Sequence, residues 1–353
     1  MTGRAEVVDW QLAVATAERM VRPGPSISAA EAASSVSELR ARAYEARQYV
    51  ADFTGLSSPQ PAIFDESRVL IVDRPGWIRA NADGFKIITE PLGRRLNERR
   101  EGLPPNGFAS LGPKATALEL GTLLAYLSSR ILGQYEIFQQ PGRLLLVAPN
   151  IVAVERELQV NPSHFRLWVC LHEETHRTQF AAVPWLRDHI LAEIQTFIAG
   201  MDTEPGSLAR RMRASTVQRR ETGGPRKQFS ELMQSPQQLV VLDRMVAVMS
   251  LLEGHADVVM DGVGPTVVPS VADIRRKFGQ RRAKGASRID AVVRRVIGLD
   301  AKIQQYRDGS RFVRAVVDEA GMAGFNRVWT SPNTLPTRAE IADPAVWIAR
   351  VRP

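Results

Sequence analysis

His172-Glu173-Glu174-Thr175-His176 is the stretch from which the rest of this sequence can be interpreted. No glycine or proline occurs from His164 to Val183, so a helix is predicted there. Residues four apart lie on one face of a helix, which allows His172 and His176 to bind one metal ion together. Zinc is the expected metal, because it accepts imidazole nitrogen and tolerates an open coordination position. Glu173 follows the first histidine, where it can act as a general base on a metal-bound water.

A third protein ligand is expected, because catalytic zinc sites usually have three. A histidine six residues after His176 would complete one common pattern, but Ala182 occupies that position. A glutamate from a later helix is the other possibility, and Glu253 and Glu193 are both candidates. We favour Glu253, because segment 238–260 is strongly apolar and an unpaired carboxylate there would be costly. Glu193 remains the alternative ligand, and a buried ion pair remains the alternative role for Glu253.

Several residues could support such a site. Asp257 lies four residues after Glu253, and we expect it to accept a hydrogen bond from the free ring N–H of a ligand histidine. His255 points to another side of the same helix, where core packing is the favoured role and oxyanion binding the alternative. Tyr306 and Arg307 are further candidates for stabilising a developing oxyanion.

The composition limits the cellular setting. The chain has 353 residues, of which 44% are hydrophobic and 24% charged, and its only cysteine is Cys170. A single cysteine excludes an internal disulfide, and charges interrupt segment 1–22 too often for a signal peptide. No apolar run approaches the roughly 20 residues that a membrane span needs. We therefore expect a cytoplasmic protein without a membrane span.

The charge is strongly basic, with a formal net charge of +8 at neutral pH. Basic runs such as 210–213 and 275–284 could contact nucleic acid, anionic lipid or an acidic substrate. Phe278 is the only aromatic residue among these runs. A solvated helical surface is therefore the favoured interpretation, and nucleic acid is not expected as a partner. The Arg-rich segment 201–227 is expected to form a lid or an exposed loop.

The hydrophobic periodicity predicts a mainly α-helical protein with a small β component. Helices are expected at 9–20, 29–53, 92–100, 114–131, 152–160, 185–199, 238–260, 271–280, 289–296, 301–306 and 312–320, and strands at 69–72 and 143–148. Ser163 is expected to cap the metal helix. Either strand could offer an edge to an extended substrate.

We expect one structural unit over residues 1–353, because both metal helices would share one core. Its parts would be N-terminal helices in 1–60, metal helices at about 163–183 and 238–260, and a helical C-terminal part in 271–353.

The chain resembles a family of zincin-like bacterial proteins, largely actinobacterial, that are described as hydrolases or zinc-dependent metalloproteases. The resemblance covers most of the chain and is carried by residues 72–78 with Asn81, 172–176 with 183–186, 252–256, 298–302 with 305–307, and Trp329 with 335–337. It implies a zincin-type metal site with His172 and His176 and a hydrolase without an established substrate. One branch is associated by name with biosynthesis of a deazaflavin coenzyme. The long stretch between His176 and Glu253 departs from the best-known gluzincins.

We therefore expect a zinc-dependent hydrolase, most simply a metallopeptidase of the gluzincin type. His172, His176 and Glu253 would hold Zn²⁺, and Glu173 would be the general base on a zinc-bound water. The substrate would be a peptide or another amide or ester. The alternative is a non-catalytic, zinc-stabilised scaffold that binds a partner through its basic surface. A closed coordination shell would distinguish that scaffold from an enzyme.

Overall fold

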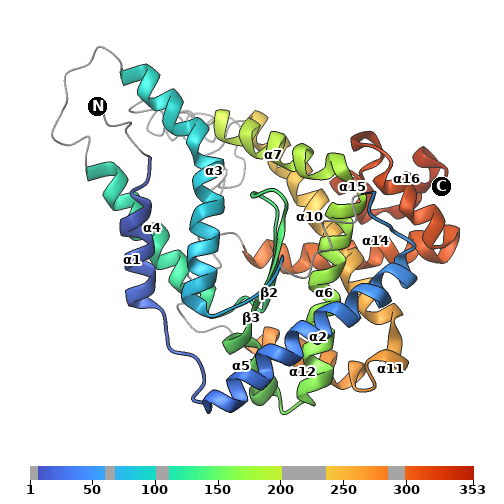
Figure 1. Ribbon diagram of the computed structural model, residues 1–353. Coiled ribbons are helices and arrows are strands. Elements are labelled where there is room, and N and C mark those ends of the chain that lie inside the picture. Colours follow the sequence, from blue (N-terminus) through green and yellow to red (C-terminus); the bar gives the residue numbers. More distant parts are fainter. Residues whose placement is uncertain (1–6, 60–67, 101–110, 201–235, 285–298) are drawn as a thin grey trace.

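A three-stranded sheet lies at the centre of a mostly helical protein (Figure 1). The computed structural model describes residues 7–59, 68–100, 111–200, 236–284 and 299–353. Strand β3 (Arg143–Val147) is central, with β1 (Val69–Val72) parallel to it on one side and β2 (Gly133–Glu136) antiparallel on the other. The predicted fold class, mainly α-helical with a small β component, is confirmed.

The sheet differs from the prediction in its edges. Strands at 69–72 and 143–148 were predicted, but β2 was not, because Gly133-Gln134-Tyr135-Glu136 is short and has no run of apolar residues. Pairing on both sides leaves β3 without a free edge, so the prediction that it could receive a substrate is wrong. The two outer strands are β1 and β2.

The side chains of β3 alternate between two cores, as the period of a strand requires. Leu144 and Leu146 pack into the larger core with α2 (Ala29–Thr54), α5 (Ala148–Leu158) and α6 (Pro162–Ala182). Leu145 and Val147 pack on the opposite face. The sheet therefore separates two helical layers.

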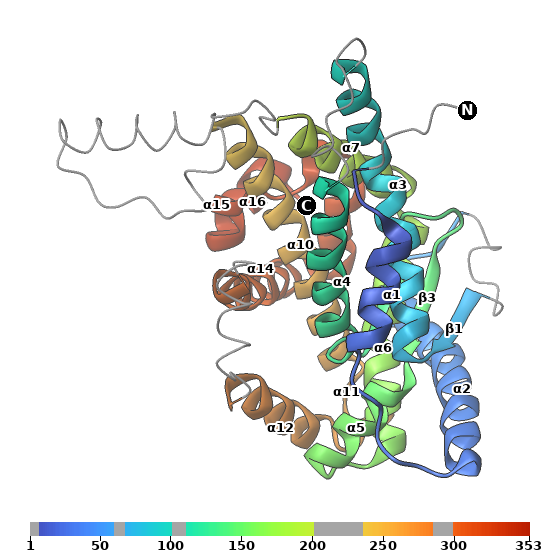
Figure 2. The same ribbon diagram turned by 90° about the vertical axis from the view of Figure 1, so that its left-hand side faces the viewer.

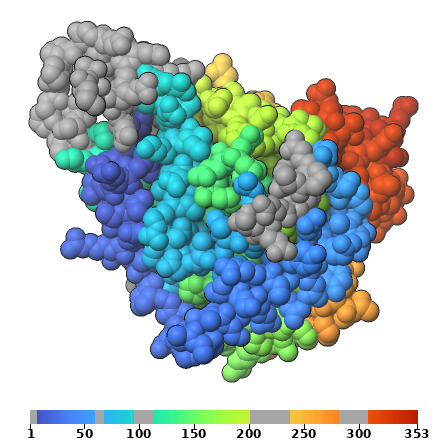
Figure 3. All heavy atoms as spheres, viewed as in Figure 1, coloured from blue at the N-terminus to red at the C-terminus, as the bar shows by residue number. Residues whose placement is uncertain are grey.

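The second layer consists of α1 (Trp10–Met20), α3 (Arg74–Arg100) and α4 (Leu111–Ser128), which pack against one another (Figure 2). Asp9 and Ser28 cap α1 and α2, and Gly55 ends α2 with a left-handed conformation. Figure 3 shows that α1, α2 and α3, blue to cyan, make up much of one face.

Helix α3 is longer than predicted, because it begins directly after β1. Asp73 accepts a hydrogen bond from the backbone N–H of Gly76 at 2.7 Å, which caps the first turn. Pro75 lies in that first turn, where its missing N–H costs nothing. Residues 74–76, which follow the predicted strand, therefore begin a helix.

Helix α6 carries the H-E-x-x-H sequence, and its cap also differs from the prediction. The Asn161 side chain accepts from the N–H of His164 at 3.1 Å, and Pro162 occupies the first turn. The Ser163 hydroxyl instead accepts from Arg42 of α2 at 2.8 Å. Ser163 therefore connects two helices and does not cap one.

The remaining helices follow α6 in the chain. They are α7 (Pro184–Ala199), α10 (Pro236–Gly262), α11 (Gly264–Val267), α12 (Val271–Lys284), α14 (Leu299–Phe325), α15 (Arg338–Ala342) and α16 (Pro344–Val351), with 3₁₀ turns at Asn326–Trp329 and Pro332–Thr334. Helix α10 packs against α6, α7, α14 and α15. The helices predicted at 301–306 and 312–320 are both parts of α14. Segments 201–227 and 289–296 lie outside the described residues. No helix in the described part of the chain is long and apolar enough to cross a bilayer.

Helices α10 and α14 cross at two glycines. A Cβ atom on Gly254 would lie 2.2 Å from the carbonyl carbon of Gly309, and one on Gly309 would lie 2.0 Å from the carbonyl oxygen of Ser250. Any larger residue at either position would push the helices apart, since real side chains do not approach so closely. The crossing is adjacent in sequence to Glu253.

Candidate metal centre

Two helices bring three possible metal ligands together. His172 and His176 lie on α6, and Glu253 lies on α10, which packs against α6. The Nε2 atoms of the two histidines are 3.2 Å apart. One Glu253 carboxylate oxygen lies 3.6 Å from Nε2 of His172, and the other lies 3.6 Å from Nε2 of His176. One possible ligand atom from each of the three residues lies within 4.8 Å of those from the other two.

The surroundings of His176 indicate which of its ring nitrogens is available. Gln179 donates from Nε2 to the carbonyl of Leu252 at 3.0 Å, which leaves its Oε1 3.0 Å from Nδ1 of His176. Nδ1 therefore carries the ring proton, and Nε2 presents a lone pair toward His172 and Glu253. Two imidazole nitrogens and a carboxylate around one point are the donor set that zinc accepts, so these residues fit the metal.

Gln179 also connects the site to His255. Its Nε2 lies 3.0 Å from Nδ1 of His255, whose ring packs against Phe325 and Trp329 at centroid distances of 5.0 and 5.7 Å. His255 is fully buried, and burial, with His176 as a second cause, lowers its pKa to about 3. It is therefore a neutral core residue, as the sequence favoured, and it does not line the cleft.

Glu173 is held beside the three candidate ligands. Its side chain is 6% exposed, and among the described residues no hydrogen-bond donor contacts its carboxylate. A Cβ atom on Gly133 of β2 would lie 2.6–2.8 Å from the Glu173 side chain, so only glycine leaves room for it. Burial, Glu253 and Glu174 raise the pKa of Glu173 well above its usual value. A buried carboxylate without a protein donor is available to a water molecule in the cleft.

The structure places the other sequence candidates as follows. Glu193 pairs with Arg244 at 2.8 Å and is not part of the cluster. Asp257 lines the cleft on α10, with Oδ1 3.7 Å from Arg275. The contact that was expected from Asp257 is made at His176 by Gln179, whose Oε1 faces Nδ1. The Nδ1 atom of His172 lies 3.3 Å from Met260 Sδ. The side chains of residues 306 and 307 lie outside the described part.

A cleft of about 1450 Å³ opens beside the cluster. His172, Glu173 and Glu253 line it together with residues of the segment 129–134, which leads into β2. Helix α12 contributes a further wall with Arg275, Lys277, Phe278 and Arg281. The candidate ligands are therefore accessible from a space large enough for a peptide segment.

Sequence reasoning missed Gln179 and Gly133. Gln179 is three residues after His176 and therefore on the same helix face, a signal that was present but shared with many polar residues. Gly133 lies in a strand that the sequence did not predict. Its role depends on a contact with residue 173, which no local pattern reveals.

A helical fold with an H-E-x-x-H helix, and with a glutamate from a second helix beside both histidines, is the arrangement of a metallopeptidase-like hydrolase. The chain belongs to the zincin-like metallopeptidase family, whose model matches residues 8–348. This family implies a metal, and His172, His176 and Glu253 could hold it. The sequence had indicated the same family through its resemblance to zincin-like hydrolases.

A solved structure is similar over almost the whole chain. It is the crystal structure of a Chloroflexus aurantiacus protein described as "a putative hydrolase with a novel fold". The two chains share 29% sequence identity with a TM-score of 0.71, and the match covers 98% of this chain and 99% of that one. No curated protein sequence matches the chain. The family and this neighbour together indicate a hydrolase.

Proposed function

We propose that the protein is a zinc-dependent peptidase of the gluzincin type. The observation that carries the proposal is the convergence of His172, His176 and Glu253, with Glu173 buried next to them. Glu253 and not Glu193 would be the third ligand, because its two oxygens lie at equal distances from the two histidines. Asp257, which lines the same cleft, would support the site from outside the ligand set.

Zinc held by these residues would polarise the substrate carbonyl and lower the pKa of a bound water. Glu173 would accept a proton from the attacking water and later return it to the leaving amine. Its position supports this role, because the carboxylate lines the cleft without a described protein donor. Gln179 would keep His176 in the tautomer whose Nε2 faces the metal.

Strand β2 supports a peptide as the substrate. Among the residues that the structure describes, it pairs only with β3, so backbone groups on its other side would be available to an extended chain. Gly133 at its start is in contact with Glu173, which brings this edge to the candidate catalytic residue. A peptide that adds to β2 would therefore pass beside Glu173.

The test combines metal analysis with a proteome-derived peptide library. Wild-type protein should contain about one zinc per chain and cleave a subset of peptides. Glu173→Gln should retain zinc and lose about 10²- to 10⁴-fold in cleavage rate, because it removes the base but preserves the shape. Cleavage at the wild-type rate by Glu173→Gln would contradict the mechanism.

The third ligand is tested separately with a matched pair of variants. Glu253→Ala should lose zinc, whereas Glu193→Ala, which removes a glutamate paired with Arg244, should keep it. The opposite result would transfer the ligand role to Glu193. Zinc closed in by four protein ligands, together with no cleavage by wild type, would favour the zinc-stabilised scaffold instead.

A further inference from the structure

The cations that line the cleft on α12 differ from Arg74, which also lines it, in how their charge is balanced. On the α12 side, each cation that lines the cleft forms an ion pair. Arg275 pairs with Asp261, Lys277 with Asp273 at 2.9 Å, and Arg281 with Glu157 at 2.8 Å. These cations are neutralised within the protein and do not need a ligand.

Arg22, Arg74 and Arg130, from three separate segments of the chain, also line the cleft. Arg74 is 8% exposed, and the groups that accept its hydrogen bonds are all neutral oxygens. It donates to the Asn150 side chain at 2.7 Å, to the Arg22 carbonyl at 2.7 Å and to the Pro23 carbonyl at 2.6 Å. No carboxylate of the described residues forms an ion pair with it. Burial and the neighbouring charge of Arg22 lower its pKa.

A buried guanidinium beside a second arginine is costly without an anion. The surrounding contacts nevertheless hold it in one position. Asn150 is 1% exposed, and while its oxygen accepts from Arg74, its nitrogen donates to the carbonyls of Ser128 and Ile131 at 2.7 and 2.6 Å. The amide oxygen and the amide nitrogen of Asn150 are thus both engaged, and this fixes the position of the Arg74 guanidinium.

The same contacts fix the distance from Arg74 to the candidate catalytic residue. Ile131 lies two residues before Gly133, which contacts Glu173. Two residues of extended chain span about 7 Å. Arg130 is held in this segment as well, since its guanidinium lies 3.7 Å from the Tyr126 ring centroid. The cationic group is therefore built into the wall that leads to the substrate edge of β2.

We propose that Arg74, with Arg22 and Arg130, forms a subsite for a carboxylate of the substrate. The protein would then act on peptides that carry a carboxylate within a few residues of the cleaved bond. That carboxylate is either the C-terminal group or an Asp or Glu side chain. This subsite rests on the proposed peptidase function, but its binding of a carboxylate can be measured without hydrolysis.

Three probes distinguish the sources of the carboxylate. They are N-acetyl-tetra-alanine as the free acid, the same peptide as its amide, and N-acetyl-Ala-Ala-Ala-Glu-amide. Binding to zinc-loaded Glu173→Gln protein is measured by titration calorimetry, so that no probe is consumed. A charge-assisted guanidinium–carboxylate contact should make one acid bind about 10-fold or more tightly than the neutral amide. Preference for the free acid identifies a C-terminal group, and preference for the Glu amide identifies a side chain.

The variants use the exposed members of the cluster, so that folding is preserved. Arg22→Gln with Arg130→Gln should reduce the acid-over-amide preference several-fold, and a further Arg74→Lys should abolish it. Arg79→Gln, which removes a cation from the same helix as Arg74 but one paired with Glu18, should leave the preference intact. Equal binding of acids and amide, no binding of any probe, or an unchanged preference in the double variant would overturn the proposal. A preference that persists while wild type cleaves nothing would retain the subsite and refute the peptidase.

Discussion

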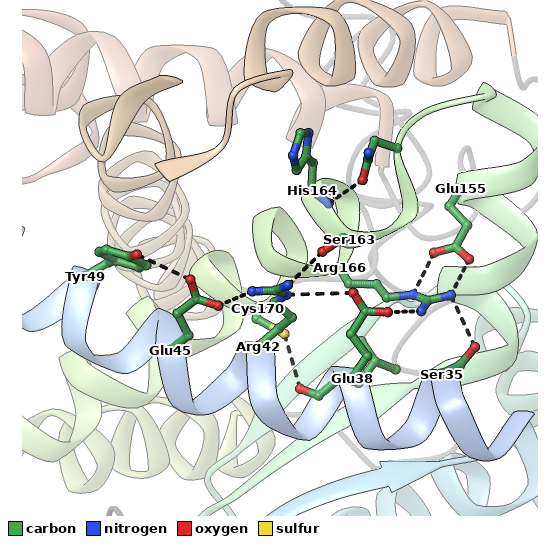
Figure 4. A network of polar contacts seen from close by, with 12 residues as sticks. Ser35, Glu38, Arg42, Glu45, Tyr49, Glu155, Ser163, His164, Arg166 and Cys170 are labelled. Carbon is green, nitrogen blue, oxygen red and sulfur yellow. Dashed lines mark hydrogen bonds and ion pairs between the residues drawn. The ribbon is translucent and has the colours of Figure 1, made fainter. Parts of the chain in front are cut away.

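Two faces of helix α6 differ in how their buried charged side chains are paired. The face toward α2 carries Arg166, which pairs with Glu155 at 2.6 Å and also with Glu38, as Figure 4 shows. On this side of the helix every buried charge in the close-up has an opposite charge within contact. The face toward α10 carries His172, Glu173 and His176, and it meets another carboxylate, Glu253.

The difference shows what the second face requires. Among the described residues, no lysine or arginine forms an ion pair with Glu173 or Glu253. Two carboxylates and two imidazoles in one place are stable when a cation lies among them. The charges of the face toward α2 are paired within the protein, whereas the face toward α10 would be stabilised by the proposed metal. The following predictions test this contrast, from the largest expected effect to the smallest.

The combined His172→Ala and His176→Ala variant should lose zinc and with it all metal-dependent activity, because only one possible ligand remains. Metal content after dialysis, measured by mass spectrometry, checks this. His164→Ala is the control, since this histidine lies on the same helix but contacts Ser270 at 2.9 Å. Full zinc occupancy in the double variant would exclude this face as the metal site.

Arg166→Met should destabilise the fold by about 3–5 kcal/mol, because it leaves the buried Glu155 carboxylate without its partner. Zinc content per folded chain should not change. Urea unfolding of the metal-free protein measures the effect. A second change, Glu155→Met, should recover much of the loss by removing the orphaned charge. A stability equal to wild type in the single variant would mean that the face toward α2 does not depend on this pair.

Gln179→Ala should weaken zinc binding by about 10- to 100-fold, because His176 loses the acceptor that fixes its tautomer. Competition with a chromophoric chelator measures the affinity. Gln238→Ala is a matched control, because this buried glutamine of α10 donates to the Phe197 carbonyl of α7. Equal affinities in both variants would show that Gln179 does not act on the metal.

The smallest effect concerns the pH dependence of stability. Burial raises the pKa of Glu174 to about 7 despite its contact with Arg177 at 2.7 Å. The folded protein then retains this proton at pH values where the unfolded chain has released it. The free energy of unfolding should therefore fall as pH rises from about 4.5 to 7, by at most about 1.4 kcal/mol per pH unit from this group.

Glu174→Gln removes the titrating group and should make this decline less steep. Urea unfolding of metal-free protein at several pH values compares the two slopes. Identical slopes would show that Glu174 has the same proton affinity in the folded and unfolded states.

The sequence was sufficient to predict those parts of the fold and of the candidate site that depend on local patterns. The spacing of His172 and His176 on a glycine-free segment predicted a helix face, and the helices predicted at 9–20 and 29–53 agree closely with α1 and α2. It was insufficient where distant residues meet. Gly133 has meaning only because residue 173 packs against it. The relation of Arg74 to Asn150 joins residues 76 positions apart. The start of α3 was not predicted, because a proline such as Pro75 is compatible both with the end of a strand and with the first turn of a helix.

The crossing of α10 and α14 at Gly254 and Gly309 has a thermodynamic consequence. Glu253 precedes this contact by one residue, so the depth at which α14 docks sets how far its carboxylate reaches toward α6. Docking of α14 and binding of the proposed metal would then be linked equilibria, in which each favours the other by the same free energy. Zinc would therefore connect α10, which packs against α14, to α6, the helix that carries the H-E-x-x-H sequence. Gly309 is not one of the candidate metal ligands, but it would help to determine the metal affinity.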